Sequence, residues 1–123
     1  MKNTLRELYL QENFITEIRN VNFLSKLEIL DISYNKLEHL DNIDQLANLE
    51  CLYLNSNKIE EYQELLNLKV NSKLTTISLF NNDITKEPGY RMKLVEILPL
   101  IDDIDGTPMK TSYKLVFSSK KEI

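Results

Sequence analysis

The sequence predicts an α/β solenoid, a stack of short coils that share one parallel sheet, and three observations lead to this fold class. First, the 123-residue chain carries one motif four times. Second, apolar residues alternate in the middle of each copy, as in a half-buried strand, and then recur at every third residue. Third, both glycines and all three prolines occur at or after Pro88, so the repeated part turns without either residue.

Each copy of the motif reads L-x-x-L-x-L-x-x-N-x-L, with aliphatic residues exchanged at some positions. The copies begin at Leu5, Leu27, Leu49 and Leu74, which are 22, 22 and 25 residues apart. A regular period of this length is typical of repeat proteins, in which no copy can bury its apolar face alone. Stacked copies therefore build one continuous core.

The middle of each copy predicts a short strand, because residues such as Leu8 and Leu10 point to one face and their neighbours to the other. About a dozen returning residues then allow the next strand to pair in parallel. The return path carries apolar residues at the three-residue spacing of 3₁₀ turns: Ile18, Val21 and Leu24; Leu40, Ile43 and Leu46; Tyr62, Leu65 and Leu68. The short parallel sheet is expected on the concave face and 3₁₀ or short helical turns on the convex face. The three extra residues within 67–74 predict a convex bulge or a longer helical turn.

Four asparagines occupy the same position of the repeat, at an inward corner of each coil: Asn13, Asn35, Asn57 and Asn82. An asparagine side chain can pair with backbone N–H and C=O groups that a turn leaves unbonded. We expect a structural ladder of asparagines that lets the chain bend without glycine or proline.

This motif is the leucine-rich repeat pattern, and its 22-residue unit resembles the short intracellular subclass. That subclass includes the regulatory subunit of protein phosphatase 1 and the repeat-type axonemal dynein light chain. Residues 90–106 read Y-R-x-x-x-V-x-x-L-P-x-I-x-x-I-D-G, which looks like the C-terminal cap of the same subclass. Such caps also occur in the A-prime protein of the spliceosomal U2 particle and in ciliary repeat proteins. The resemblance implies cap roles for Tyr90, Arg91, Leu98, Pro99, Ile104, Asp105 and Gly106.

The expected domain covers residues 1–110, with the cap at about 85–108 and a basic tail at 111–123. Pro88 and Gly89 interrupt the repeat, and apolar residues at near-helical spacing from Tyr90 to Leu98 predict a helix over the last coil. No comparable lid precedes Leu5. Either the chain is truncated there, or another protein or a second copy covers the N-terminal face.

Composition excludes several classes of protein. The formal charge of −4 and a pI near 5.0 disfavour direct binding to nucleic acid through a basic surface. No window approaches 18 consecutive apolar residues and no signal peptide is evident, which predicts an intracellular protein without membrane contact. The cytoplasm or the cilium and cytoskeleton are favoured over the nucleus. A single cysteine, Cys51, excludes an intramolecular disulfide.

Catalysis finds no support in the sequence, so we expect no enzyme, no cofactor and no metal. His39 is the only histidine and is expected in a solvated loop. Cys51 lacks a cationic neighbour in its strand and is expected to be inert. The acidic run from Asp102 to Asp105 lacks the spacing of a calcium loop, because Asp105 and Gly106 read as a turn.

The exposed strand positions form the predicted partner-binding face. Tyrosines, Ile29 and Phe80 are candidate anchors, because the centres of interfaces favour aromatic residues. Carboxylates in the first three copies favour a partner with a basic or mixed helix or extended segment. The alternative is an ordinary solvated sheet face with cross-strand tyrosine pairs. The candidate residues are Glu7, Tyr9, Gln11, Ile29, Asp31, Ser33, Tyr34, Glu50, Cys51, Tyr53, Asn55, Ser78 and Phe80.

The leading functional hypothesis is a non-catalytic protein-binding subunit of a ciliary or other cytoskeletal assembly. The alternatives are a phosphatase-1 regulator, a ribonucleoprotein component that binds protein, and a structural unit of a larger repeat array. The tail contains Tyr113-Lys114-Leu115-Val116-Phe117, and the lysines in it and just before it are Lys110, Lys114, Lys120 and Lys121. It is either a flexible basic extension or a segment that docks as a strand on the body or on a partner.

Overall fold

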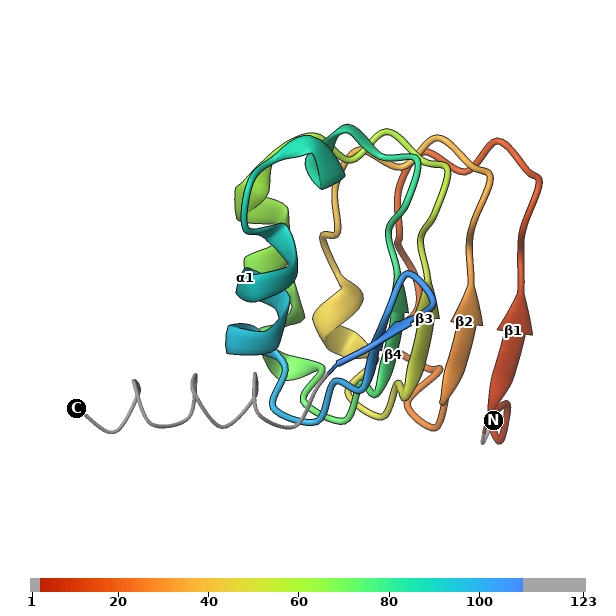
Figure 1. Cartoon of the computed structure of the whole chain (residues 1–123). Coiled ribbons are helices and arrows are strands. Elements are labelled where there is room, and N and C mark those ends of the chain that lie inside the picture. Colours follow the sequence, from red (N-terminus) through yellow and green to blue (C-terminus); the bar gives the residue numbers. More distant parts are fainter. Residues whose placement is uncertain (1–2, 110–123) are drawn as a thin grey trace.

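The structure, a computed structural model, describes residues 3–109 and shows a short solenoid whose strands lie side by side (Figure 1). The strands are β1 (Glu7–Tyr9), β2 (Ile29–Asp31), β3 (Cys51–Tyr53), β4 (Thr76–Ser78), β5 (Asp103–Ile104) and β6 (Thr107–Pro108). The helices are three 3₁₀ helices, η1 (Ile43–Gln45), η2 (Tyr62–Val70) and η3 (Asp83–Lys86), and one α-helix, α1 (Tyr90–Ile97). The predicted tail at 111–123 lies outside the described residues.

One sheet of six strands runs the length of the solenoid in the order β1-β2-β3-β4-β5-β6. The pairs from β1 to β5 are parallel, and β6 turns back antiparallel to β5. In the second and third coils, η1 and η2 return the chain on the side opposite the sheet (Figure 1). The predicted solenoid with a parallel sheet and short helical turns is therefore confirmed.

The return path of the first coil, between β1 and β2, contains no 3₁₀ helix, but it makes turns of the predicted 3₁₀ type: the Leu24 N–H donates to the Val21 carbonyl at 2.9 Å and the Leu27 N–H to the Leu24 carbonyl at 3.1 Å. The first coil also buries less of its motif. Leu27, Leu49 and Leu74 open their copies fully buried, whereas Leu5 keeps 40% of its surface exposed. The reason is that each later coil is covered on both sides, while the first is covered on one side only among the described residues.

The three-residue insertion lengthens a helix. η2 has nine residues where η1 has three, so of the two predicted forms the longer helical turn is the one observed. Asn71 follows η2 and is fully buried. Its Nδ2 donates to the carbonyl oxygens of Ile43 and Leu46, both at 3.0 Å, and joins the third coil to the second. This linking role was not predicted from the sequence.

The asparagine ladder is confirmed in the three inner coils. Asn57 Nδ2 donates to the Ile32 carbonyl of the preceding coil at 3.1 Å and to the Leu54 carbonyl of its own coil at 2.9 Å. Its Oδ1 accepts the N–H of Leu37 at 2.9 Å, again from the preceding coil. Each rung therefore satisfies buried backbone groups on two coils at once.

Asn35 and Asn82 make the same bonds to their own coil and to the preceding coil, whereas over residues 3–109 Asn13 makes only the bonds to its own coil. Asn13 is exposed, and within the described residues its Nδ2 bonds only to carbonyls of its own turn, those of Leu10 at 2.9 Å and Gln11 at 3.1 Å. Asn13 therefore holds the predicted corner of its coil but is exposed there, because the described residues place no preceding coil against it.

Residues with a left-handed backbone conformation also bend the coils. The residue before each ladder asparagine has a positive φ: 59° at Glu12, 56° at Tyr34, 59° at Ser56 and 60° at Asn81. This conformation costs a non-glycine residue about 1–2 kcal/mol. The asparagines alone were predicted to replace glycine at these bends, and the structure adds a strained residue beside each of them.

The cap closes the C-terminal end of the core. Helix α1 buries Tyr90, Leu94 and Val95 against the last coil and ends at Ile97, one residue earlier than predicted. Leu98 and Ile104 are fully buried, and Pro99 follows the helix end. Together these residues cover the apolar face that the fourth coil would otherwise expose.

Asp105 joins α1 to the end of the sheet. Its Oδ1 accepts the backbone N–H groups of Leu79 at 2.6 Å and Phe80 at 2.9 Å. Its Oδ2 accepts the hydroxyl of Tyr90 and lies 3.5 Å from the guanidinium of Arg91. Burial and the bond to Asp105 raise the pKa of Tyr90 to about 12. Asp105 and Gly106 form the predicted turn, with φ of 56° and 80° between β5 and β6.

Candidate functional site

The register of the sheet places residues of the concave face in rows. Glu7, Ile29, Cys51, Thr76 and Asp103 are direct neighbours across five strands. The second row is Tyr9, Asp31, Tyr53 and Ser78. Asp103 was not predicted, because the I-x-x-I-D-G stretch read as a turn and β5 was not foreseen. The side chains of each row are about 4.8 Å from the next and can contact one partner together.

Three predicted face residues are buried: Ser33, Asn55 and Ser78. The Ser33 hydroxyl donates to Asp31 Oδ1 at 2.6 Å, and the Ser33 N–H donates to the same oxygen at 3.0 Å. Their expected exposure is wrong. Gln11 and Phe80 share the repeat position of Ser33 and Asn55 and are exposed, so the repeat position alone does not decide exposure on this face. The more accessible candidates are Glu7, Tyr9, Gln11, Ile29, Asp31, Tyr34, Glu50, Cys51, Tyr53 and Phe80.

Aromatic side chains stand out on this face. Tyr9 is 55% exposed, Tyr34 is 52% exposed and Phe80 is 43% exposed, while Tyr53 and Ile29 are half-buried between them. Exposed aromatic residues on a rigid sheet provide contact area at a low cost in side-chain entropy. Tyr34 has the strained φ described above, so the bend itself sets the direction of its side chain.

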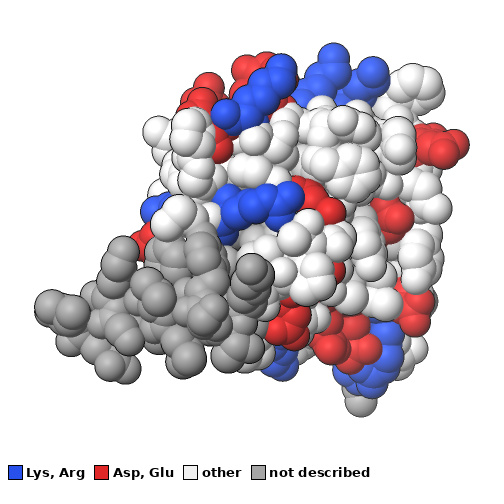
Figure 2. All heavy atoms as spheres, in the orientation of Figure 1, with Lys and Arg blue, Asp and Glu red and all other residues white. Residues whose placement is uncertain are grey.

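Carboxylates dominate the charge of the face. The strand segments of the first three coils carry one basic residue, Arg6, and five acidic ones. The acidic residues are Glu7, Glu12, Glu28, Asp31 and Glu50. Figure 2 shows acidic side chains separated by uncharged surface over the strand side of the solenoid, with basic side chains at the upper edge, near the centre and at the lower edge. The Arg6 guanidinium lies 3.2 Å from Glu28, and both groups remain partly exposed. The face is therefore acidic with aromatic contacts, and it suits a partner that carries basic groups.

Two tyrosines of the face are held as neutral hydroxyls. The Tyr9 hydroxyl donates to Glu7 Oε1 at 2.7 Å, and this bond raises the pKa of Tyr9. Burial, followed by the neighbouring Cys51 thiol, raises the pKa of Tyr53. The Tyr9 proton is already donated to Glu7, so the Tyr9 oxygen can only accept a hydrogen bond from a partner, whereas the Tyr53 hydroxyl can donate one.

His39 lies away from this face and bonds to Glu64 of the next coil. Its Nδ1 is 3.1 Å from Glu64 Oε2, and the bond raises the pKa of His39. Glu64 Oε1 also accepts the Leu40 N–H at 2.7 Å. The histidine is more than half exposed, as predicted, but its carboxylate partner was missed because the two residues are 25 positions apart.

Within residues 3–109, no group of three or more histidine, cysteine, aspartate or glutamate residues could hold a metal ion. Over the same range, no helix has the length and apolar character needed to span a membrane. Cys51 is a half-buried free thiol.

The coils, the asparagine ladder and the cap define a repeat solenoid with a parallel concave sheet, and comparison with known families agrees. The leucine rich repeat family matches residues 3–59 and again residues 70–87. The chain is a leucine-rich repeat protein.

Two relatives share the name dynein axonemal assembly factor 11. The protein from Danio rerio is 41% identical over 111 residues, and the match covers 90% of this chain and 25% of that protein. The protein from Trypanosoma brucei brucei is 35% identical over 118 residues, covering 96% of this chain and 31% of the relative. The chain thus spans about a quarter to a third of the length of these relatives.

Solved structures agree on the fold. The complex of SNF and U2A′ from Drosophila melanogaster matches with a TM-score of 0.70 at 24% identity, covering all of this chain and 93% of that chain. An internalin from Listeria monocytogenes also matches with a TM-score of 0.70 at 26% identity, over 85% of this chain and 29% of that chain. Both matches show the leucine-rich repeat fold of this chain.

Proposed function

We propose that this protein is a non-catalytic binding module that acts in the assembly of ciliary dyneins and holds a protein partner on its concave face. The names of its relatives support the dynein context, and their identity extends over nearly the whole chain. Because the chain spans only part of their length, this support concerns the matched segment of each relative. We expect the module to work in the cytoplasm or the cilium.

The observation that carries the binding role is the combination of exposed aromatic residues and carboxylates on one rigid surface. Tyr9, Tyr34 and Phe80 supply apolar contact, and Glu28 and Glu50 supply charge at the edge of the face. Six strands spaced about 4.8 Å apart make a surface about 24 Å wide. A helix of about 16 residues has the same length at 1.5 Å per residue. A basic or mixed helix, or an extended segment, therefore fits across the strands.

A second candidate is a structural unit within a larger repeat array. The observation that favours it is the partly exposed apolar end of the first coil, where Leu5 and Leu8 are less covered than their equivalents in later coils. In that case, binding would depend on the end of the solenoid and not on its concave face.

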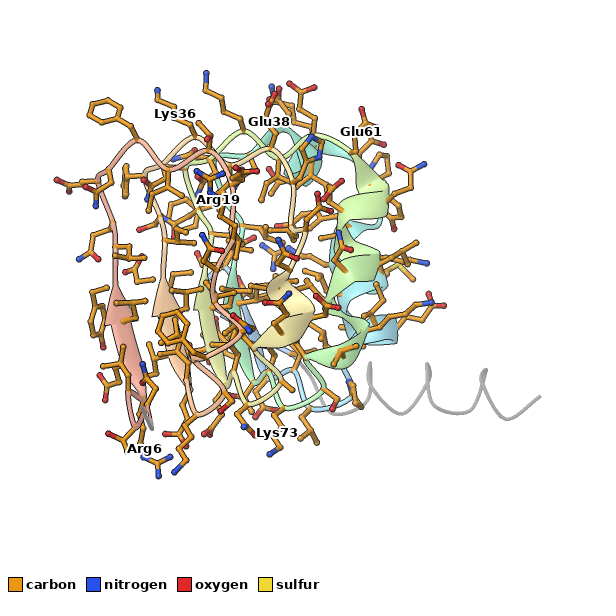
Figure 3. All side chains as sticks on the ribbon, turned by 180° about the vertical axis from the view of Figure 1, so that it is seen from behind. Arg6, Arg19, Lys36, Glu38, Glu61 and Lys73 are labelled. Carbon is orange, nitrogen blue, oxygen red and sulfur yellow. The ribbon has the colours of Figure 1, made fainter. Side chains whose placement is uncertain are left out.

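The test is capture of axonemal dynein subunits from ciliated cells by three forms of the protein. Glu50→Lys reverses one charge on the face without removing a side-chain hydrogen bond that the structure shows. Glu61→Lys is the matched control, since Glu61 lies at the start of η2 on the opposite side of the coils (Figure 3). We expect the wild type and Glu61→Lys to capture dynein subunits equally, and Glu50→Lys to capture less than a tenth as much. Equal capture by all three forms would refute binding through the concave face.

A further inference from the structure

The N-terminal end of the solenoid contains an apolar hollow that the described residues leave open. The hollow has a volume of about 160 Å³ and is lined mainly by aliphatic side chains of the first two coils. Leu8, Leu10, Ile15 and Val21 are only partly buried there, whereas their counterparts in the next coil, such as Leu30 and Leu37, are buried. This end is therefore an unpartnered face of the core.

Strand β1 presents unpaired backbone groups along the same edge. The Ile29 N–H donates to the backbone carbonyl of Arg6 at 2.9 Å, and the Leu10 N–H donates to the backbone carbonyl of Asp31 at 2.7 Å. The backbone groups of even-numbered residues in the first strand segment therefore bond to β2. In a parallel pair, the intervening residues direct their N–H and C=O groups to the other side. The backbone groups of Glu7 and Tyr9 consequently point outward, ready for a further strand.

The ladder is incomplete at this end. In the second coil, Asn35 donates to the Leu10 carbonyl at 3.0 Å and accepts the Ile15 N–H at 3.0 Å. Asn13 is the equivalent residue of the first coil, and its Oδ1 has no partner within the described residues. An added strand that fits this edge must therefore offer one carbonyl to Asn13 Nδ2 and, five residues later, one N–H to its Oδ1.

We propose that residues 113–122 of a second copy of this chain add to β1 as a parallel strand and fill the hollow. Aligning Leu115 with Leu8 and Phe117 with Leu10 places two apolar side chains over the opening. The same register places Lys114 beside the carboxylate of Glu7, a favourable cross-strand pair.

This register also completes the asparagine ladder. In the inner coils, the Asn35 Nδ2 donates to the Leu10 carbonyl of the preceding strand segment. In the proposed alignment, the Asn13 Nδ2 donates in the same way to the Phe117 carbonyl. The N–H of Glu122 takes the place of the Ile15 N–H, five residues further along. The two apolar residues of the strand, the charge pair and the ladder spacing therefore agree in a single alignment, while Glu122 falls on the aliphatic position that Ile15 holds in the first coil.

The strand must come from another copy, because its own chain cannot reach. Residue 109 follows β6, and β1 lies at the opposite edge of the sheet. From β6 to a position beyond β1 there are six strand spacings of about 4.8 Å, a distance of about 29 Å. The five steps from Met109 to Lys114 extend over about 17 Å at most. A head-to-tail contact of this kind links copies in series.

The first test is sedimentation velocity of the full chain over a range of concentrations. We expect association that increases with concentration. Phe117→Asp places a charge in the hollow and should weaken association by about 30-fold or more. Ser119→Asp is the matched control, since its register equivalent, Glu12, is exposed, and it should associate like the wild type. A chain that remains monomeric at all concentrations, or equal association of the two variants, would overturn the proposal.

A mixing experiment separates the donating segment from the accepting edge. Tyr9→Pro removes one outward N–H but leaves the β1–β2 bonds in place, so this variant keeps its donor segment. Phe117→Asp keeps the accepting edge. We expect each variant alone to be monomeric and their mixture to form a one-to-one complex. A mixture that remains monomeric would contradict the exchange of a strand between copies.

Charge exchange tests the register. Glu7→Lys and Lys114→Glu should each weaken association by about two- to five-fold, as expected for an exposed pair. The double variant should recover the affinity of the wild type. Additive losses in the double variant would show that Lys114 is not placed beside Glu7, and would refute the proposed alignment.

Discussion

Replacing Asn57 by leucine tests whether the ladder holds neighbouring coils together. The substitution removes the acceptor of the Leu37 N–H, which belongs to a fully buried residue. The carbonyls of Ile32 and Leu54 lose one donor each but keep the side-chain amides of Asn35 and Asn82. One backbone donor is therefore left buried without a partner, which costs about 1–3 kcal/mol of the free energy of unfolding.

Urea unfolding measures this loss directly. With a slope of about 2 kcal/mol/M, the midpoint should fall by about 0.5–1.5 M at an unchanged slope. Asn13→Leu is the matched control, because Asn13 is exposed and its loss leaves no buried N–H without an acceptor. Its effect should stay within about 0.5 kcal/mol. If Asn57→Leu were neutral, or if the two variants lost equal stability, the inner rungs would not be what joins the coils.

Three further predictions concern residues away from the concave rows. The pKa of His39 is raised by its bond to Glu64, so the pair adds stability below the ordinary histidine pKa of 6.5 and loses it as the pH rises through the raised value. The difference in urea midpoint between pH 6 and pH 8 should shrink in His39→Gln. Ser56→Gly should relieve the strained φ of 59° and raise the free energy of unfolding by up to about 1 kcal/mol, whereas Ser56→Val should lower it; thermal unfolding compares the two. Asp105→Asn removes the charged acceptor of the cap and should cost about 1–3 kcal/mol in urea. It should also bring the pKa of Tyr90 down from about 12, as measured by ultraviolet titration.

The repeat made much of the fold predictable from the sequence. The spacing of Leu27 and Leu49, with Asn35 and Asn57 at fixed positions between strands, was sufficient to predict the parallel sheet and the ladder. Because the four copies share one motif, equivalent positions pair across neighbouring strands, and the strand register of one pair predicts that of the others. The cap was predictable for a different reason, because its motif resembles a known subclass.

The features that could not be predicted depend on contacts between coils or on backbone geometry. Glu64 meets His39 only because two coils stack, and Asn71 bonds across coils from within an insertion that breaks the period. The left-handed residue Tyr34 carries no glycine signal. Ser33 was expected to be exposed from its repeat position, which it shares with the exposed Phe80, but its short side chain bonds to Asp31 and is buried.

The central claim is that the concave face of this module binds a protein needed for the assembly of ciliary dyneins. The most direct measurement replaces the equivalent segment of the Trypanosoma brucei brucei relative by this chain and scores axonemal dynein in the resulting cells. Three chimaeras are compared: the unaltered chain, Glu50→Lys on the face and Glu61→Lys on the opposite side. We predict normal axonemal dynein with the unaltered chain and with Glu61→Lys, and loss of dynein with Glu50→Lys. Normal dynein in all three chimaeras would contradict a role for the concave face, and loss in all three would contradict a shared function of the segment.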